Sequence, residues 1–362
     1  MNGLNPPPVH FWPLLALCLL AFAGLWWFVL GARRLARRRQ LRRRIEALGS
    51  AAPAPEDTAP AALRQAATQT RQALAQSTAP RMRTPPLYRI PWFMFLGDDA
   101  SDVGGLLDAA QRTAPEPLAR TGAAEAFWRW RQLPSMVAIE TRPALLHESA
   151  DDLQERALWC EALVTLAEQR RRLPLNGIVV CADVAGLGAG AQDSGPVARR
   201  LIDEAAEALQ LHLPVYLVVT GLEQLPGYDA LRAALPAEVL AQALGHRLPN
   251  IPAQGTSFEG RFDALFDTLT LRLHALRMGL LRDPRTLAQR QGIHAFVEQL
   301  FALRPGLEAL AACLFDNPRG SRPPRWRGLY FAAAPSEEAD GGAFVADLFQ
   351  HFLPADQPLA RS

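Results

Sequence analysis

Short apolar runs, separated by amphipathic stretches, recur along most of the chain. Five of them are predicted to be buried strands, namely Trp92–Leu96, Met136–Ile139, Gly177–Ala182, Pro214–Val219 and Gly328–Ala332. Runs of about five β-branched, aromatic or aliphatic residues without polar alternation are typical of parallel strands that are covered on both faces. Because helical patterns lie between the runs, the sequence predicts an α/β domain of three layers.

Helical periodicity is clearest in four segments. Residues Asp151–Arg172 and Val197–Gln210 have apolar side chains at helical spacing and precede the third and fourth predicted strands. Two longer segments, Phe262–Leu281 and Ile293–Phe315, follow one another with no strand between them. We therefore expect a helical extension over about residues 258–318, before the chain returns to its last strand.

The N-terminal region contains an uncharged, mostly apolar run from Phe11 to Ala32, long enough to cross a hydrocarbon core of about 30 Å as a helix. Eight arginines follow within residues 33–44. A cleaved signal peptide would carry its basic residues before the apolar run. The pattern predicts an uncleaved transmembrane helix at 11–32, a periplasmic segment at 1–10, a basic juxtamembrane segment at 33–48 and a cytoplasmic C-terminal side.

Composition divides the rest of the chain. Residues 49–86 are rich in Ala, Pro, Gln and Thr and have few large apolar side chains, so we expect a linker there. Residues 87–354 have the apolar content of a globular domain, and residues 355–362 are expected to be a short tail.

Charge and cysteine usage exclude several kinds of site. The formal net charge is +2 although eight arginines lie in the juxtamembrane segment, so the remainder is mildly acidic and does not suggest binding to nucleic acid. The four cysteines are far apart, and no Cys or His spacing matches a metal, haem or redox motif. We expect no metal and no cofactor.

The segment after the first predicted strand is laid out like a phosphate-binding loop. The strand ends at Gly97, and a helix is expected from about Gly105. A working loop has the pattern G-x-x-x-x-G-K-S/T, whose lysine and hydroxyl contact phosphate and magnesium. Here Val103 and Gly104 occupy those two positions, Asp102 is among three added negative charges, and the chain contains no lysine. The loop is predicted not to bind phosphate.

Several strings together resemble the cytoplasmic GTPase-like domain of the IcmF/TssM inner-membrane proteins of type VI secretion. The resemblance covers about residues 87–354. The strings that carry it are Ile90-Pro-Trp-Phe-Met-Phe-Leu-Gly97, Arg171-Arg-Leu-Pro-Leu-Asn-Gly-Ile-Val-Val180, Leu213-Pro-Val-Tyr-Leu-Val-Val-Thr220, Arg325-Trp-Arg-Gly-Leu-Tyr-Phe-Ala332 and Phe344-Val-Ala-Asp-Leu-Phe-Gln-His-Phe-Leu353. The resemblance implies a P-loop-NTPase-like fold, an inner-membrane location and partners in the membrane complex or baseplate of a secretion system.

The chain departs from this family at all three nucleotide motifs. Besides the phosphate loop, the family's D-T-A-G segment corresponds to Glu140-Thr-Arg-Pro143, and its T-K-C-D base-recognition motif to Thr220-Gly-Leu-Glu223. We therefore expect no catalytic residues, no nucleotide cofactor and no enzymatic activity. Gly97, Asp102, Val103, Gly104, Thr220 and Glu223 are expected to be remnants of a nucleotide site.

The favoured hypothesis is a membrane-anchored pseudo-GTPase that acts as a structural or assembly component of a type VI secretion system. One alternative is an NTPase in which an arginine binds phosphate, although the loop itself has no arginine near Val103. The other is a membrane-tethered adaptor in a different cell-envelope process. Trp128, Trp130 and Arg131 suggest a recognition patch, but a half-buried aromatic pair on one helix face is the simpler interpretation.

Overall fold

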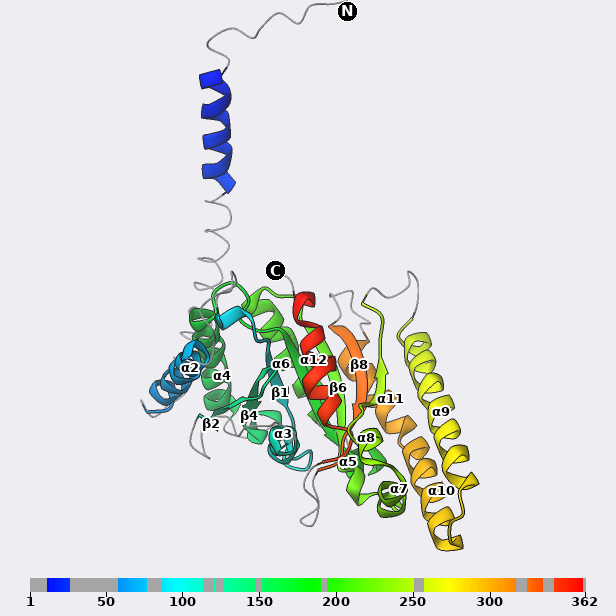
Figure 1. The fold of residues 1–362 in the computed structure, drawn as a ribbon. Helices are drawn as coiled ribbons and strands as arrows, with labels where there is room; N and C mark the ends of the chain where they lie inside the picture. The colour runs from blue at the N-terminus through cyan, green and yellow to red at the C-terminus, as the bar shows by residue number, and fades with distance from the viewer. Residues whose placement is uncertain are drawn as a thin grey trace, which may run out of the picture.

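A computed structural model describes residues 12–26, 58–76, 86–112, 120–121, 127–147, 152–189, 194–250, 257–316, 324–334 and 342–360. Residues 12–26 form a helix with exposed apolar side chains, drawn in dark blue in Figure 1. No helix within the described ranges is both long and apolar enough to cross a lipid bilayer. The predicted span Phe11–Ala32 lies partly outside these ranges, and the predicted segments 1–10 and 33–48 lie wholly outside them.

The core of the fold is an eight-stranded sheet with strand order β2-β3-β4-β1-β5-β6-β8-β7. Its strands are β1 (Trp92–Leu96), β2 (Arg120–Thr121), β3 (Trp128–Gln132), β4 (Val137–Thr141), β5 (Gly177–Asp183), β6 (Pro214–Thr220), β7 (Leu244–Arg247) and β8 (Arg325–Phe331). The five apolar runs of the sequence are β4, β1, β5, β6 and β8, and these five pair in parallel. The remaining strands pair antiparallel at the two sides of the sheet.

Helices cover both faces of this sheet (Figure 1). One face packs against α2 (Thr58–Gln76), α4 (Asp152–Gln169), α6 (Ser194–Leu209), α9 (Phe258–Arg282), α10 (Leu287–Ala302) and α11 (Arg304–Phe315). The other face packs against α3 (Val103–Arg112) and the C-terminal segment, which contains a π-helix (Leu348–Phe352) and α12 (Leu353–Ala355). Along β1, Trp92 and Met94 point to the first face, and Phe93 and Phe95 to the second. This confirms the predicted three-layer α/β class.

The remaining helices are short and lie in the connections. They are η1 (Pro86–Tyr88), η2 (Pro143–Leu146), α5 (Val184–Ala189), η3 (Leu222–Gln224), α7 (Tyr228–Ala234), α8 (Ala237–Leu240) and η5 (Gln357–Leu359). The predicted helical extension is confirmed as the consecutive helices α9, α10 and α11. Gly227, at φ 86°, precedes α7 and abuts the backbone of Gly292 in α10, so a side chain at Gly227 would collide with that helix.

The prediction that residues 49–86 form a linker is wrong for residues 58–76. These residues form α2, which packs on α4 and on the sheet. Leu63, Ala66, Ala67 and Thr70 lie on its buried face. Alanines contribute little apolar area, but they allow the helix to lie close to its neighbours, so one leucine and small residues make a buried face.

Trp128 and Trp130 lie on a strand, and the expected half-buried pair on a helix is therefore wrong. In β3 both indoles are about 1% exposed and pack with Trp92 and Trp159. Successive side chains of a strand point to opposite faces, so Arg129 and Arg131 point away from these tryptophans.

The packed domain also continues beyond residue 354, where the sequence predicted a tail. Asp356 is 2% exposed. Its carboxylate accepts hydrogen bonds from the Tyr216 hydroxyl at 2.6 Å and from Arg327 at 2.8 and 3.1 Å, and it forms an ion pair with Arg247. Because these partners come from β6, β7 and β8, this buried cluster ties the end of the chain to three strands.

Candidate functional site

The remnant nucleotide motifs meet at one edge of the sheet. The loops that follow β1, β5 and β6 lie at the carboxyl ends of these parallel strands. In the sheet, β1 lies between β4 and β5, both of which come later in the sequence. In open α/β sheets, the crevice beyond the carboxyl ends at such a change of strand order is the usual ligand site. The loop 97–102, which follows β1 and leads into α3, lies in this place.

The loop after β1 is closed by its own side chains. The Ser101 amide donates to the Asp98 carboxylate at 2.9 Å, and the Ser101 hydroxyl donates to the Asp98 carbonyl at 2.8 Å. A side chain on Gly97 would overlap the Ser101 hydroxyl and Val103, which shows how tightly the turn is folded. An amide that could otherwise face a phosphate is therefore already bonded within the loop.

Asp102 supplies an internal anion at the start of α3. It occupies the position of the second glycine of a phosphate-binding loop and has the left-handed conformation, with φ 38°. Its carboxylate accepts a hydrogen bond from the Gly105 amide at 2.9 Å. The amino end of a helix favours a negative charge and commonly binds phosphate. Here a side chain of the chain itself caps that end.

Val103 and Gly104 lie where the lysine and the hydroxyl would be expected. Val103 is 6% exposed and packs in the core with Leu106 and Leu107. A side chain built on Gly104 would point between Glu140, at 3.4 Å, and Arg131, at 3.6 Å. Neither residue has a side-chain group that could hold a phosphate or a magnesium ion.

Glu140, which stands in place of the family's metal-side carboxylate, lies in a network of arginines. It is 2% exposed and is directly opposite Arg129 in the antiparallel pair of β3 and β4. It forms an ion pair with Arg129 and accepts from the Arg131 Nε at 2.9 Å. Arg131 is also paired with Asp108 of α3. Arginine side chains thus neutralise the carboxylate that a metal ion would otherwise neutralise.

The base-recognition side is also occupied by internal contacts. The Thr220 hydroxyl donates to the Ser101 carbonyl at 2.8 Å, which joins the end of β6 to the loop after β1. Glu223 accepts from the Ala334 amide at 3.0 Å, so it contacts the segment that follows β8. Burial, followed by the nearby carboxylates of Asp183 and Asp102, raises the pKa of Glu223 above its usual value.

The remaining space at this edge is small. Asp102, Thr220 and Glu223 line one cavity of about 100 Å³ together with Ser101, whereas Val103 and Gly104 do not line it. Sites for small molecules usually have about 300–1,000 Å³. Across the described parts of the chain, no group of His, Cys, Asp or Glu side chains is arranged to hold a metal ion. The arrangement favours a closed, acidic contact between loops over a site for a nucleotide.

Arg131 is the residue of this site whose role the sequence did not reveal. The sequence showed no arginine in the loop itself, but the fold brings Arg131 from β3 to Gly104. The alternation Trp128-Arg-Trp-Arg131 was the available signal, because a period of two predicts a strand with both arginines on one face. The guanidinium is committed to Glu140 and Asp108, so it does not face an open phosphate site.

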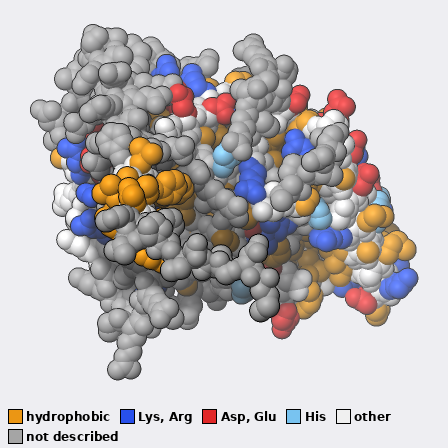
Figure 2. Space-filling view, turned by 90° about the horizontal axis from the view of Figure 1, so that it is seen from above, with side chains coloured by type: hydrophobic (Ala, Val, Ile, Leu, Met, Phe, Trp, Pro, Cys, Tyr) orange, Lys and Arg blue, Asp and Glu red, His pale blue; other side chains and the backbone are white. Residues whose placement is uncertain are grey.

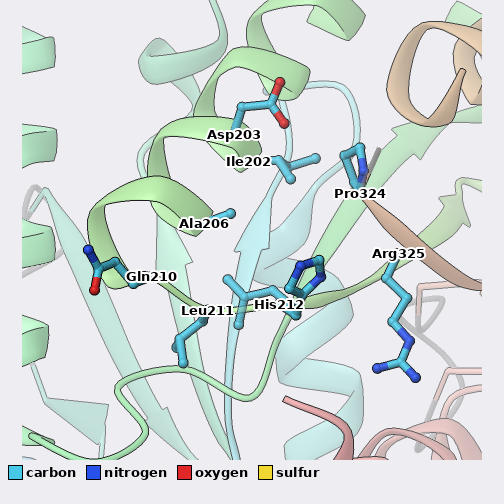
Figure 3. Close-up of a pocket in the computed structure, with 9 residues that line it drawn as sticks. Ile202, Asp203, Ala206, Gln210, Leu211, His212, Pro324 and Arg325 are labelled. Atoms are coloured by element: carbon cyan, nitrogen blue, oxygen red, sulfur yellow. The ribbon is translucent and has the colours of Figure 1, made fainter. Parts of the chain in front are cut away.

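A second cavity, of about 270 Å³, lies at the opposite edge of the sheet, between α6 and the start of β8 (Figure 3). Its lining residues include Asp203, His212 and Arg325. The Arg325 guanidinium donates to the carbonyl oxygens of Asn250 and Leu359 at 3.0–3.3 Å. Arg325 therefore links the backbone at Asn250 to the backbone at Leu359. None of the remnant nucleotide motifs contributes to this cavity.

Comparison with known proteins identifies a matching family and a similar protein. The family described as the IcmF-related N-terminal domain matches residues 152–362, more than half of the chain. A type VI secretion system component, TssM1 of Pseudomonas aeruginosa, is 27% identical over 292 residues, which cover 76% of this chain and 26% of TssM1. The chain therefore spans about a quarter of the length of that relative.

Proposed function

The chain belongs to the IcmF-related family, and from this premise we propose that it is a non-hydrolysing pseudo-GTPase that helps to assemble the membrane complex of a type VI secretion system. The secretion role is supported by the similarity to TssM1 over three quarters of the chain. The family assignment alone does not distinguish an enzyme from a structural component. That distinction rests on the site at the carboxyl edge of the sheet.

The observation that supports a non-catalytic role is the filling of the nucleotide site by the chain's own charges. Asp102 caps the helix end that would bind phosphate, and Arg131 neutralises the carboxylate that would face magnesium. Both contacts are made within the chain, without a ligand. A nucleotide with its metal would have to displace these buried or hydrogen-bonded groups.

The membrane location is part of the same proposal. The uncharged run Phe11–Ala32 and the arginines after it favour a single span with the α/β domain on the cytoplasmic side. The described part of that run is helical, and its apolar side chains are exposed. A span in the inner membrane would hold the domain next to other components of the secretion complex and raise their effective concentration.

We expect the purified full chain to show no saturable binding of GTP or ATP in the presence of magnesium. A ligand present at about 100 times its Kd would stabilise the folded state by about 2.7 kcal/mol, so binding would be readily visible as a rise in Tm. Thermal unfolding with and without nucleotide checks this. A concentration-dependent rise in Tm would instead support an NTPase with a noncanonical site.

The matched variant for this test is the double substitution Val103→Lys and Gly104→Ser. It restores the two missing residues but leaves Asp102 and Arg131 in place. We expect this variant to remain without nucleotide binding. Binding gained through these two changes alone would show that the internal charges do not fill the site.

We also expect the chain to co-purify from membranes with membrane-complex or baseplate proteins of a type VI system, with a yield that nucleotide does not change. The Gly104→Ser variant, which alters the remnant site without placing a charge in the core around Val103, should give the same yield, because the assembly role does not use the remnant site. Mass spectrometry after affinity purification measures this. Recovery of no secretion component from a strain that expresses its system would favour the adaptor in a different process.

A further inference from the structure

The outer face of α9 is the part of the described domain with exposed large apolar side chains on a regular helix stripe. Among the described residues outside 12–26, three such side chains are exposed: Leu271 (71%), Met278 (54%) and Leu287 (72%). Leu287 begins α10 at the tip of the helical hairpin, whereas Leu271 and Met278 are seven residues apart on α9. Figure 2 shows orange side chains beside blue ones at its right-hand end, over α9 and α10.

The opposite face of α9 already has its partners. Phe262, Leu269, Leu273 and Leu280 are buried against the domain. The outer stripe has the same helical periodicity but no such cover. Ala275 and Gly279 are exposed within it, and a side chain built on Gly279 would meet no atom within 4 Å. The stripe therefore has a small residue, Ala275, at its middle, and the open space beside Gly279 leaves room for another helix.

The stripe is complementary to the same stripe of a second copy that runs in the opposite direction. Asp267 lies four residues before Leu271, and Arg282 lies four residues after Met278. Two antiparallel copies that cross beside Ala275, between residues 274 and 275, would place Leu271 against Met278 and Asp267 against Arg282, on both sides of a two-fold axis. A dimer with this symmetry needs such reciprocal pairing of one surface with itself. Alanine at the crossing lets two helices approach closely.

The charges at the two ends of the stripe are available for this pairing. Arg282 is exposed at the last position of α9. The Asp267 side chain is 70% exposed and is 3.8 Å from Arg304, which has a closer partner in Asp263 at 2.7 Å. A turn of the Asp267 side chain toward a second molecule would leave that Arg304–Asp263 pair intact.

We propose that the outer stripe of α9, defined by Asp267, Leu271, Ala275, Met278 and Arg282, binds the same stripe of a second copy of this chain in an antiparallel arrangement. This self-association is separate from the proposed secretion role, because the contact is made only by residues of α9. One helix pair buries a small area compared with the standard interface of about 1,600 Å². The contact is therefore weak in dilute solution and is strengthened where two copies are held together.

The first test places a cysteine next to the expected two-fold axis. The Ala275→Cys variant of the full chain, in a Cys18→Ser background, should form a disulfide-linked dimer under mild oxidation, since helices crossing there bring the two Cα atoms within bonding range. Ala288→Cys, exposed on α10 and away from the stripe, is the matched control. Equal cross-linking of both variants, or none of Ala275→Cys, overturns the proposal.

The second test exchanges the charges. Asp267→Arg alone and Arg282→Asp alone each create two like-charge contacts in a symmetric dimer, so each should weaken self-association about tenfold, which corresponds to about 1.4 kcal/mol. A mixture of the two variants restores both opposite-charge pairs in the heterodimer. Sedimentation velocity and Ala275→Cys cross-linking should then show recovery in the mixture.

This charge exchange separates the proposal from other occupants of the stripe. A partner of another kind, or a lipid surface, would respond to each substitution singly but would not be rescued by mixing. Absence of rescue therefore overturns the proposal even if each single variant loses cross-linking. Because the measurement uses only this chain, failure to co-purify secretion proteins would leave its result unchanged.

Discussion

Replacing Asp356 with alanine is expected to lower the free energy of unfolding by about 3–5 kcal/mol. The carboxylate is buried and bonds to the guanidinium of Arg327 and the hydroxyl of Tyr216, with Arg247 paired beside them. Without it, Arg327 remains in the interior without its counter-charge. Removal of one partner from a buried ion pair is costly because the other charge stays desolvated. Urea unfolding of the full chain, followed by circular dichroism, measures the change.

The matched control for this variant is Asp263→Ala. Asp263 pairs with Arg304 at 2.7 Å, but both side chains are well exposed to solvent. Exposed ion pairs contribute about 0–1 kcal/mol, so this variant should unfold close to the wild type. If Asp356→Ala cost no more than Asp263→Ala, the C-terminal segment would not be fastened to the sheet as the structure shows.

The second large effect is expected at Arg131. Arg131→Met keeps the side-chain length but removes the charge that links Glu140 of β4 to Asp108 of α3. Glu140 is 2% exposed and would keep only Arg129 as a partner. We expect a loss of about 3 kcal/mol or more in the free energy of unfolding, by the same desolvation argument.

A double-variant cycle tests whether Arg131 acts through Glu140. The Arg131→Met, Glu140→Gln double variant should be more stable than the sum of the single effects predicts, by about 1–3 kcal/mol, because it leaves no buried unpaired carboxylate. Arg156→Met, which removes a partly exposed pair with Glu204, is the control and should cost about 1 kcal/mol or less. Additive single effects would contradict the network.

The parallel part of the fold could be predicted because its signal is local. Five apolar runs, each about five residues long, gave β1, β4, β5, β6 and β8, and the strand-free stretch before the last run gave the helical extension. The antiparallel strands carried weaker signals. β3 interleaves tryptophan with arginine, and those arginines are neutralised by Glu140 and Asp108, which the fold brings there from later and earlier segments. Sequence spacing alone does not show that pairing.

The motifs predicted which residues are remnants of a nucleotide site, but they did not show the contacts that surround those residues. The losses at Val103 and Gly104 were visible in the sequence. The contacts that replace the ligand were not, because they join distant residues: Thr220 contacts Ser101, and Glu223 contacts Ala334. The prediction that the domain ends at residue 354 was wrong for the same reason. Asp356 looks like part of a polar tail until Tyr216 and Arg327 are seen around it.

The short strand β7 has a consequence for behaviour at high local concentration. An open strand edge exposes unpaired amides and carbonyls, on which other chains can add strands and aggregate. β7, which forms one of the two edges of the sheet, has four residues and includes Gly245 at φ 156°. Its Arg247 side chain points inward and pairs with Asp356. Arg272 of α9 donates to the Gly245 carbonyl at 3.4 Å, which further occupies the edge. Copies of this protein that are held close together should therefore resist the addition of strands at the β7 edge.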